Sequence, residues 1–111
     1  MKFNHFAIIF TSPGADPTMH RATIQIGEIT YATVGVDSLH KEQVVEVAKA
    51  LVAEGAQILE LCGGFGPIWM TRVIEAVKGA VPVGGVFYGP EARKPLVDLG
   101  LIQPLNFEGK I

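Results

Sequence analysis

The chain has 111 residues, the length of one domain, of which 49% are apolar and 18% charged, and its net charge is −2. Its nine Lys and Arg residues are scattered without a basic stripe, so nucleic acid is excluded as a partner. No apolar run approaches the roughly 20 residues of a membrane helix, and the N-terminus lacks a signal-peptide pattern. We therefore expect a single α/β domain over residues 1–111, in the cytoplasm and without a membrane partner.

The apolar fraction is high for so small a domain, because a small body has proportionally more surface to cover with polar groups. Part of the apolar surface is therefore expected to meet another subunit, which predicts a homo-oligomer. The single cysteine, Cys62, cannot form an internal disulfide, which agrees with a reducing compartment.

The first half of the chain is rich in β-forming residues. Residues 3–10 (FNHFAIIF) predict a strand, and residues 12–21, with two prolines and a glycine, predict an irregular loop. Residues 22–36 are again β-rich and predict either one long strand or a hairpin that turns at Gly27-Glu28.

The second half alternates helices with strands. Asp37-Ser38 is a helix-capping signature, and an apolar face with helical spacing follows over residues 44–52 until Gly55. Residues 57–62 predict a strand, and Pro67 suits the first turn of a helix that ends at Gly79. Residues 81–88 predict another strand, and a last helix runs from Pro90 to about Leu99, before a tail over residues 103–111.

This order, β-β-α-β-α-β-α, predicts a mostly parallel sheet of four to five strands with helices mainly on one face. Side chains alternate between the faces of a strand, so each strand should have one apolar side for the helices. We assign to that side Phe6, Ile8 and Phe10, then Ala32, Val34 and Val36, then Leu59 and Leu61. The opposite, semi-polar side takes His5, Tyr31, Thr33, Glu60 and Cys62.

Three glycines lie where the strand ending at Cys62 passes into the next helix. Loops at the C-terminal ends of parallel strands gather ligands, since helix N-termini direct free N–H groups there. No Gly-Lys-Ser/Thr follows, and Trp69 occupies a position that a dinucleotide fingerprint needs to be small, so no nucleotide cofactor is expected. Two readings stay open: a tight turn that needs positive φ, or a binding site for a small anionic ligand lined by Thr11, Ser12, Gly63, Gly64, Gly66, Tyr88 and Glu91.

Catalytic candidates are few. Cys62 precedes a helix N-terminus, where a thiol can become nucleophilic, but a solitary cysteine is also an ordinary buried apolar residue. Glu60 shares its face, and His5 would join them if the first strand lies beside theirs, giving the residue types of nucleophile, base and orienter. The alternative is that Glu60 pairs with an Arg across an interface. His5, His20 and His40 have no metal-ligand spacing, so no metal is expected.

Three segments, VGVDS at residues 34–38, ELCGGFGP at residues 60–67 and VPVGGVFYGPEAR at residues 81–93, resemble a family of small bacterial proteins catalogued only as a domain of unknown function. The resemblance covers nearly the whole chain. It implies a bacterial, cytoplasmic protein, and it assigns no catalytic residue because no activity belongs to that family.

Two hypotheses about function follow from the sequence. The first is an α/β domain, either a binding protein or an enzyme, that binds a small molecule or anion beside Gly63-Gly64-Phe65-Gly66. The second is a non-catalytic homo-oligomer whose glycine loop is only a tight turn and whose semi-polar face is an interface.

Overall fold

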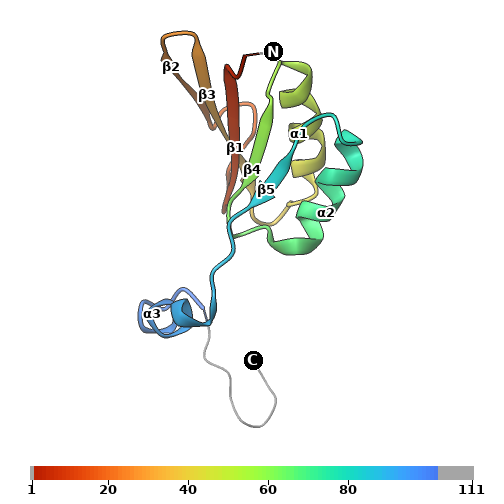
Figure 1. Ribbon diagram of the computed structural model, residues 1–111. Helices are drawn as coiled ribbons and strands as arrows, with labels where there is room; N and C mark the ends of the chain where they lie inside the picture. Colours follow the sequence, from red (N-terminus) through yellow and green to blue (C-terminus); the bar gives the residue numbers. More distant parts are fainter. Residues whose placement is uncertain (1, 103–111) are drawn as a thin grey trace.

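The computed structural model describes residues 2–102 as a five-stranded, mostly parallel sheet with three helices (Figure 1). The predicted tail, residues 103–111, lies outside the described residues. Its elements are β1 (His5–Ser12), β2 (Arg21–Ile26), β3 (Ile29–Asp37), α1 (Gln43–Ala53), β4 (Ile58–Leu61), α2 (Gly66–Val77), β5 (Val83–Gly85), a 3-10 turn η1 (Pro90–Ala92) and α3 (Arg93–Asp98).

The strands lie in the order β2-β3-β1-β4-β5, and only β2 is antiparallel to its neighbour. The hairpin alternative for residues 22–36 is confirmed, because Ile26 pairs with Ile29 across a two-residue turn. Gly27 has φ +58° in that turn, a conformation that glycine adopts at little cost. The C-terminal ends of the four parallel strands therefore share one edge of the sheet, called the C-terminal edge below.

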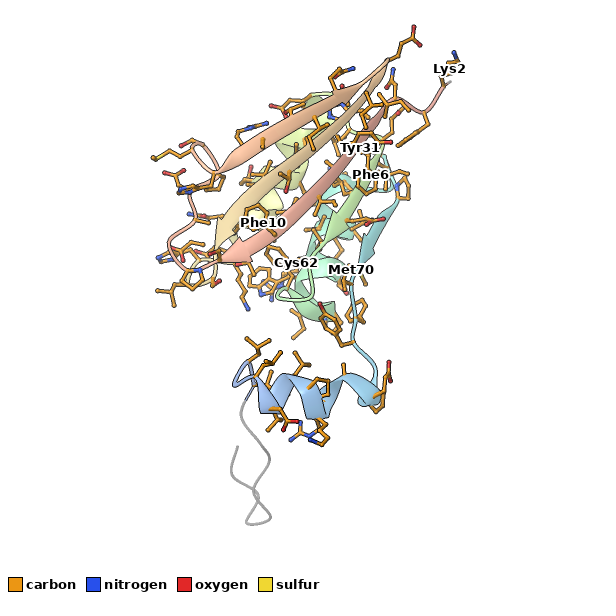
Figure 2. All side chains as sticks on the ribbon, turned by 90° about the vertical axis from the view of Figure 1, so that its left-hand side faces the viewer. Lys2, Phe6, Phe10, Tyr31, Cys62 and Met70 are labelled. Atoms are coloured by element: carbon orange, nitrogen blue, oxygen red, sulfur yellow. The ribbon has the colours of Figure 1, made fainter. Side chains whose placement is uncertain are left out.

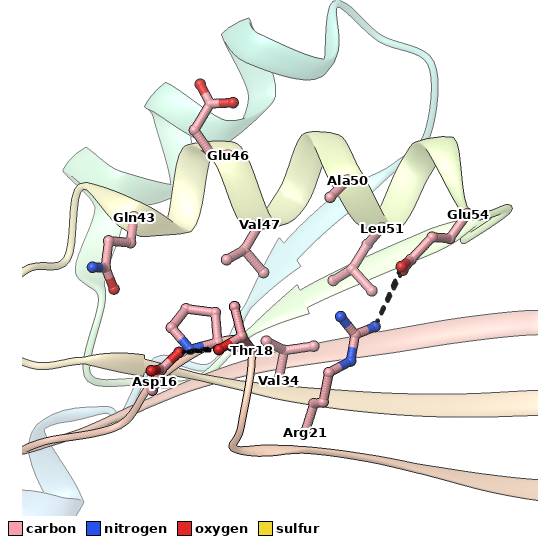
Figure 3. A pocket seen from close by; sticks show the side chains of 11 residues that line it. Asp16, Thr18, Arg21, Val34, Gln43, Glu46, Val47, Ala50, Leu51 and Glu54 are labelled. Atoms are coloured by element: carbon pink, nitrogen blue, oxygen red, sulfur yellow. Dashed lines mark hydrogen bonds and ion pairs between the residues drawn. The ribbon is translucent and has the colours of Figure 1, made fainter.

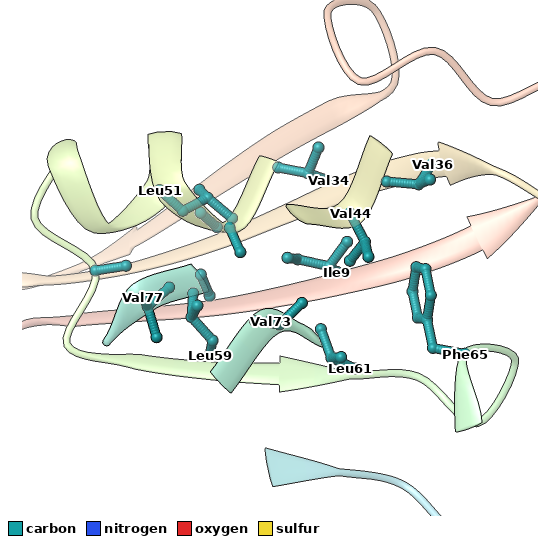
Figure 4. Packing of buried hydrophobic residues seen from close by; sticks show 14 residues of the cluster. Ile9, Val34, Val36, Val44, Leu51, Leu59, Leu61, Phe65, Val73 and Val77 are labelled. Atoms are coloured by element: carbon teal, nitrogen blue, oxygen red, sulfur yellow. The ribbon is translucent and has the colours of Figure 1, made fainter. Parts of the chain in front are cut away.

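Helices α1 and α2 cover one face of the sheet, and the core lies between them and β1, β3 and β4 (Figure 4). Helix α1 begins at Gln43, later than the capping signature at Asp37-Ser38 suggests. The Asp37 carboxylate instead accepts hydrogen bonds from the N–H groups of Leu39 and Gly14, so it closes a turn before the helix. The fully buried residues of β1 are Ala7 and Ile9.

The prediction that Phe6, Ile8 and Phe10 of β1 face the helices was wrong. The side chains that face the helices are Ala7 and Ile9, whereas Phe6 pairs with Tyr31 and Ile8 with Thr33 on the opposite face. Both alternating sets of β1 are apolar, so a period of two cannot tell which one faces the helices. The assignments for β3 and β4 were right for Ala32, Val34, Val36, Leu59 and Leu61, all of which are buried.

Among the described residues, no helix covers the other face of the sheet, called the open face below (Figure 2). Paired residues of a ladder point to the same side, so the register defines its members. The Phe6 and Tyr31 rings stack there at a tilt, with centroids 5.9 Å apart. Apart from Glu60 and Asp37, the residues that the register places on this face are uncharged, among them Ala22, Ile24, Tyr31, Thr33, Phe6, Ile8, Phe10 and Ile58. Cys62 follows β4 at the end of this face.

Residues 86–102 leave the sheet after β5 and form an extended arm that carries η1 and α3, called the C-terminal arm below (Figure 1). Helix α3 contacts η1 and lies away from the helices and strands of the body. The radius of gyration is 15.8 Å, above the roughly 13 Å of a compact domain of this length. The last predicted helix exists, but it packs on no part of its own sheet.

Candidate functional site

The C-terminal edge is held together by Thr11 at the end of β1. Its hydroxyl donates a hydrogen bond to the Val36 carbonyl over 2.9 Å and lies 3.1 Å from the Ser38 hydroxyl. Its N–H donates to the Cys62 Sγ over 3.3 Å. Thr11 therefore links the C-terminal ends of β1, β3 and β4. Its hydroxyl hydrogen bonds with two protein groups, the Val36 carbonyl and the Ser38 hydroxyl.

Close packing explains two glycines of the loop. A Cβ on Gly64 would stand 2.5 Å from Cγ2 of Thr11, and one on Gly63 would stand 2.9 Å from the Tyr88 ring. Contacts that short force a neighbour to move, so only glycine fits without rearrangement. Gly66 differs, since nothing lies within 4 Å of its Cβ position but its φ is +76°.

The same loop has a cationic neighbour. Lys41 lies in the loop that follows β3, and its Nζ donates a hydrogen bond to the Gly64 carbonyl over 2.8 Å. The other two predicted ligand residues lie at the margins of this group. Ser12 ends β1 beside Asp37, and Glu91 lies on the C-terminal arm. Thus the structure brings together Thr11, Gly63, Gly64 and Tyr88, and leaves Ser12 and Glu91 at the periphery.

Asp37 is a well-connected residue of this edge. Hydrogen bonds first from the Leu39 N–H and then from the Gly14 N–H hold the pKa of its carboxyl below the ordinary value. Asp16 in the loop after β1 has a lowered pKa for a similar reason, because the backbone N–H and then the hydroxyl of Thr18 donate to it. Both carboxylates therefore accept hydrogen bonds within their own loops, which stabilises the loop conformations.

The structure separates His5 from the other two catalytic candidates. Strand β1 does lie beside β4, as the hypothesis required, but the Cys62 N–H bonds to the carbonyl of Ile9, four residues beyond His5. That offset is about 13 Å along the strand. His5 also points to the helix side with Ala7, whereas Glu60 and Cys62 lie on the open face. No nucleophile–base pair forms from these three residues.

A groove of about 450 Å³ lies elsewhere, between α1 and the β2–β3 hairpin on the helix side of the sheet (Figure 3). Its floor is apolar, formed by Val34, Val47 and Leu51. Charged groups stand around it: Arg21 bonds to the Glu54 carboxylate over 3.3 Å at one end, and Asp16 lies at the other (Figure 3). No local sequence pattern marks this groove, because its lining comes from three separate segments of the chain.

Residues 2–102 contain neither a metal-binding cluster nor a membrane-spanning helix. No group of three or more His, Cys, Asp or Glu side chains there is placed to hold a metal ion. No helix in the same range has the length and apolar composition needed to cross a membrane. The candidate functional regions of the described residues are therefore the C-terminal edge, the groove and the open face.

Comparison with known families agrees with the resemblance noted in the sequence. A family of unknown function, DUF6506, matches residues 4–99. The chain belongs to the DUF6506 family. The match takes in the sheet, α1, α2 and the C-terminal arm as far as Leu99, so the arm is part of the family's domain. Searches of curated proteins and of solved structures return no match.

Proposed function

We propose that this chain is a homo-oligomeric assembly domain that buries its open face against a second copy. The observation that carries the proposal is the open face itself, which is largely apolar over four strands and which no helix within residues 2–102 covers (Figure 2). Ile24 is 63% exposed and Ile8, in the central strand, is 38% exposed. On the opposite side of β1, Ala7 and Ile9 are fully buried under the helices, so the two faces of this strand differ in their cover.

The energetics favour an interface there. Removing an exposed Ile, Phe or Leu side chain fully from water is worth about 1.5–3 kcal/mol, and several such side chains adjoin on the open face. Contiguous apolar patches of this kind on a monomer mark interaction sites. Asp37 and Glu60 are the charged exceptions; Asp37 accepts hydrogen bonds from two backbone N–H groups, whereas no ion pair involves Glu60 among the described residues. A cation from a partner would satisfy Glu60.

The glycine loop needs no ligand in this account. Gly63 and Gly64 are required by their contacts with Tyr88 and Thr11, and Gly66 by its positive φ. These constraints support the tight-turn reading of the loop over the anion-binding one. The assembly proposal therefore includes no catalytic residue, cofactor or anion.

The experiment is light scattering of the full chain against two substitutions. The wild type should have about twice the 11.9 kDa mass of one chain, or a higher multiple. Ile24→Asp on the open face should shift it to the monomer. Ile68→Asp, at an exposed isoleucine in the first turn of α2, should leave the assembly intact. A wild type that is monomeric at tens of micromolar would refute the proposal.

The groove between α1 and the hairpin supports a second candidate function, the binding of a small molecule. Its volume of about 450 Å³ lies within the range of ligand sites. Three carboxylates, Asp16, Glu46 and Glu54, surround an apolar floor. Glu54 pairs with Arg21 and Glu46 with Lys49, so the carboxylates there exceed their cationic partners by one. That combination fits a ligand with a cationic head and an apolar body.

A thermal-shift comparison of matched ions tests this second candidate. Hexylammonium should raise the melting temperature through binding to the native state, and hexanoate, of similar size and opposite charge, should not. The same shift with both ions, or with neither, would exclude charge-selective binding in the groove.

A further inference from the structure

The C-terminal arm exposes apolar side chains on the part of the chain with the fewest contacts. Leu99 and Leu101 are 74% and 66% exposed, and Phe87 at the base of the arm is more than half exposed. Helix α3 has six residues, too short to be stable in water by itself. An ordered arm of this composition requires a surface to pack on.

The base of the arm is fixed in a direction that leads away from its own sheet. The Val86 N–H donates to the Leu61 carbonyl over 2.9 Å, and the Tyr88 ring packs against Gly63. Beyond these contacts the chain passes the C-terminal edge, with Gly89 extended, before η1 begins (Figure 1). These contacts hold residues 86–88 at the C-terminal edge, and the helical part of the arm begins beyond them at Pro90.

The dimensions of the arm match those of the open face. Five strands at about 4.8 Å spacing make a sheet about 19 Å wide. The helical part of the arm, from Pro90 to Asp98, is about 14 Å long at about 1.5 Å per residue. An arm laid across the sheet would therefore cover most of its strands.

The charges match as well. The register places two charged residues on the open face, Asp37 and Glu60. Asp37 accepts hydrogen bonds from the N–H groups of Gly14 and Leu39, whereas no ion pair involves Glu60 among residues 2–102. The arm carries Arg93 and Lys94 next to its apolar residues. Lys94 is engaged with Asp98 over 2.5 Å, whereas Arg93 makes no ion pair within the described part of the chain. A guanidinium suits a partly buried carboxylate better than an ammonium does.

We infer that the C-terminal arm of each copy lies across the open face of a second copy, in a reciprocal exchange with Arg93 of the arm beside Glu60 of the face. Two-fold symmetry makes such an exchange closed, because each copy supplies one arm and one face. This inference rests on the proposed assembly function and names the segment that fills the interface. It covers the apolar surfaces of the arm and the face with one contact.

Two single variants and their mixture test the exchange. Leu101→Asp damages the arm and Ile24→Asp damages the face, so each alone should be monomeric where the wild type is a dimer. An equimolar mixture should form dimers again, because the intact arm of the Ile24→Asp chain can lie on the intact face of the Leu101→Asp chain. Light scattering measures the mass, and capture through a tag on one variant shows that the dimers are mixed.

The control matches Leu101 in exposure. Ile68 is also 66% exposed but lies on the helix side of the sheet, so Ile68→Asp should remain a dimer. Far-ultraviolet circular dichroism should show that all three variants are folded.

Each other outcome has a distinct meaning. Leu101→Asp dimers together with Ile24→Asp monomers would overturn the arm exchange and leave the assembly proposal standing, with sheets packed face to face. Two monomeric variants that do not complement each other would also overturn the exchange, and would favour an arm that closes on its own face. A monomeric wild type would overturn both the exchange and the assembly proposal.

Charge reversal tests the predicted pair directly. Glu60→Arg and Arg93→Glu should each weaken dimerisation at least about tenfold, and the double variant should recover most of that loss if the two side chains meet. Equal losses in the single and double variants would show that Arg93 and Glu60 do not contact each other.

Discussion

The two faces of the sheet have similar apolar content and opposite surroundings. On the helix side, Ile9, Leu59 and Leu61 are at most 1% exposed, and α1 and α2 supply the cover. On the open side, Phe6, Ile8 and Phe10 come from the same strand as Ile9 but have no helix of residues 2–102 above them. Helices α1 and α2 thus cover one of two apolar faces of the sheet.

The two faces of β1 also differ in the size of their side chains. The helix side of β1 has Ala7 and Ile9, and its open side has two phenylalanines. Gly35 opposite Phe10 leaves room for that ring, whose atoms would lie 2.7 Å from a Cβ at position 35. Large side chains thus gather on the face that lacks intramolecular cover, as expected for a surface whose partner is another chain.

The largest expected effect compares one leucine of the covered face with one isoleucine of the open face. Leu59→Ala leaves a cavity in a site that cannot collapse, and should lower the free energy of unfolding by about 3 kcal/mol. Ile8→Ala should cost about 1 kcal/mol in the monomer, because its side chain already meets water. Urea unfolding at two protein concentrations measures both values.

The dependence of these two stability losses on protein concentration should also differ between the two faces. The cost of Leu59→Ala should be the same at both concentrations, whereas that of Ile8→Ala should grow where the wild type is a dimer. A concentration-independent cost for Ile8→Ala would contradict an interface on the open face.

The next effect concerns glycines on either side of the sheet edge. Gly64→Ala brings a Cβ to 2.5 Å from the Thr11 side chain, and should lower the free energy of unfolding by about 1–3 kcal/mol. Gly84→Ala in β5 is the matched control, since nothing lies within 4 Å of its Cβ position, and it should change stability by less than about 0.5 kcal/mol. Thermal unfolding with and without millimolar phosphate completes the test. A phosphate-dependent rise in the wild type that Gly64→Ala abolishes would restore the anion-binding reading.

Much of the fold was predictable because local patterns agree with it. The hairpin turn at Gly27-Glu28, the stop of α1 at Gly55 and the start of α2 at Pro67 each follow from backbone preferences of one or two residues. The start of α1 was not, because Asp37 and Ser38 use their side chains to hold the C-terminal edge rather than to cap the helix. Local capping potential was overridden by contacts between distant segments.

The site was less predictable for the same reason. The sequence indicated that Thr11, Gly63 and Gly64 belong to one edge, but their mutual contacts decide that the glycines serve packing. The phase of β1 required knowledge of its partners, since Ala7 and Ile9 are as apolar as their neighbours. The groove by Arg21 and Glu54 joins residues 33 positions apart, and no local pattern marks it.

A smaller effect should appear at Cys62, which lies half-buried at the end of the open face. A thiol reagent should label the native protein slowly and the denatured protein quickly, because Sγ packs against Thr11 and Gly64. Leu101→Asp should label faster than the wild type at the same concentration, since loss of the arm uncovers the face. Equal labelling rates for the two proteins would mean that the C-terminal arm of the partner does not cover Cys62.

The smallest expected effect compares Asp37, whose carboxylate has N–H donors, with Glu75, an exposed carboxylate of α2 without a hydrogen-bond donor among the described residues. Because the folded-state pKa of Asp37 is lowered, its contribution to stability is present above the unfolded value near 3.8 and is lost as the pH falls through the folded value. The melting temperature of the wild type should therefore fall between pH 5 and pH 3, and Asp37→Asn, already less stable at pH 5, should fall less. Glu75→Gln should follow the wild type over this range. An Asp37→Asn variant with an unchanged acid limb would show that the turn joining Gly14 and Leu39 does not contribute to the stability of the C-terminal edge, from which the arm departs.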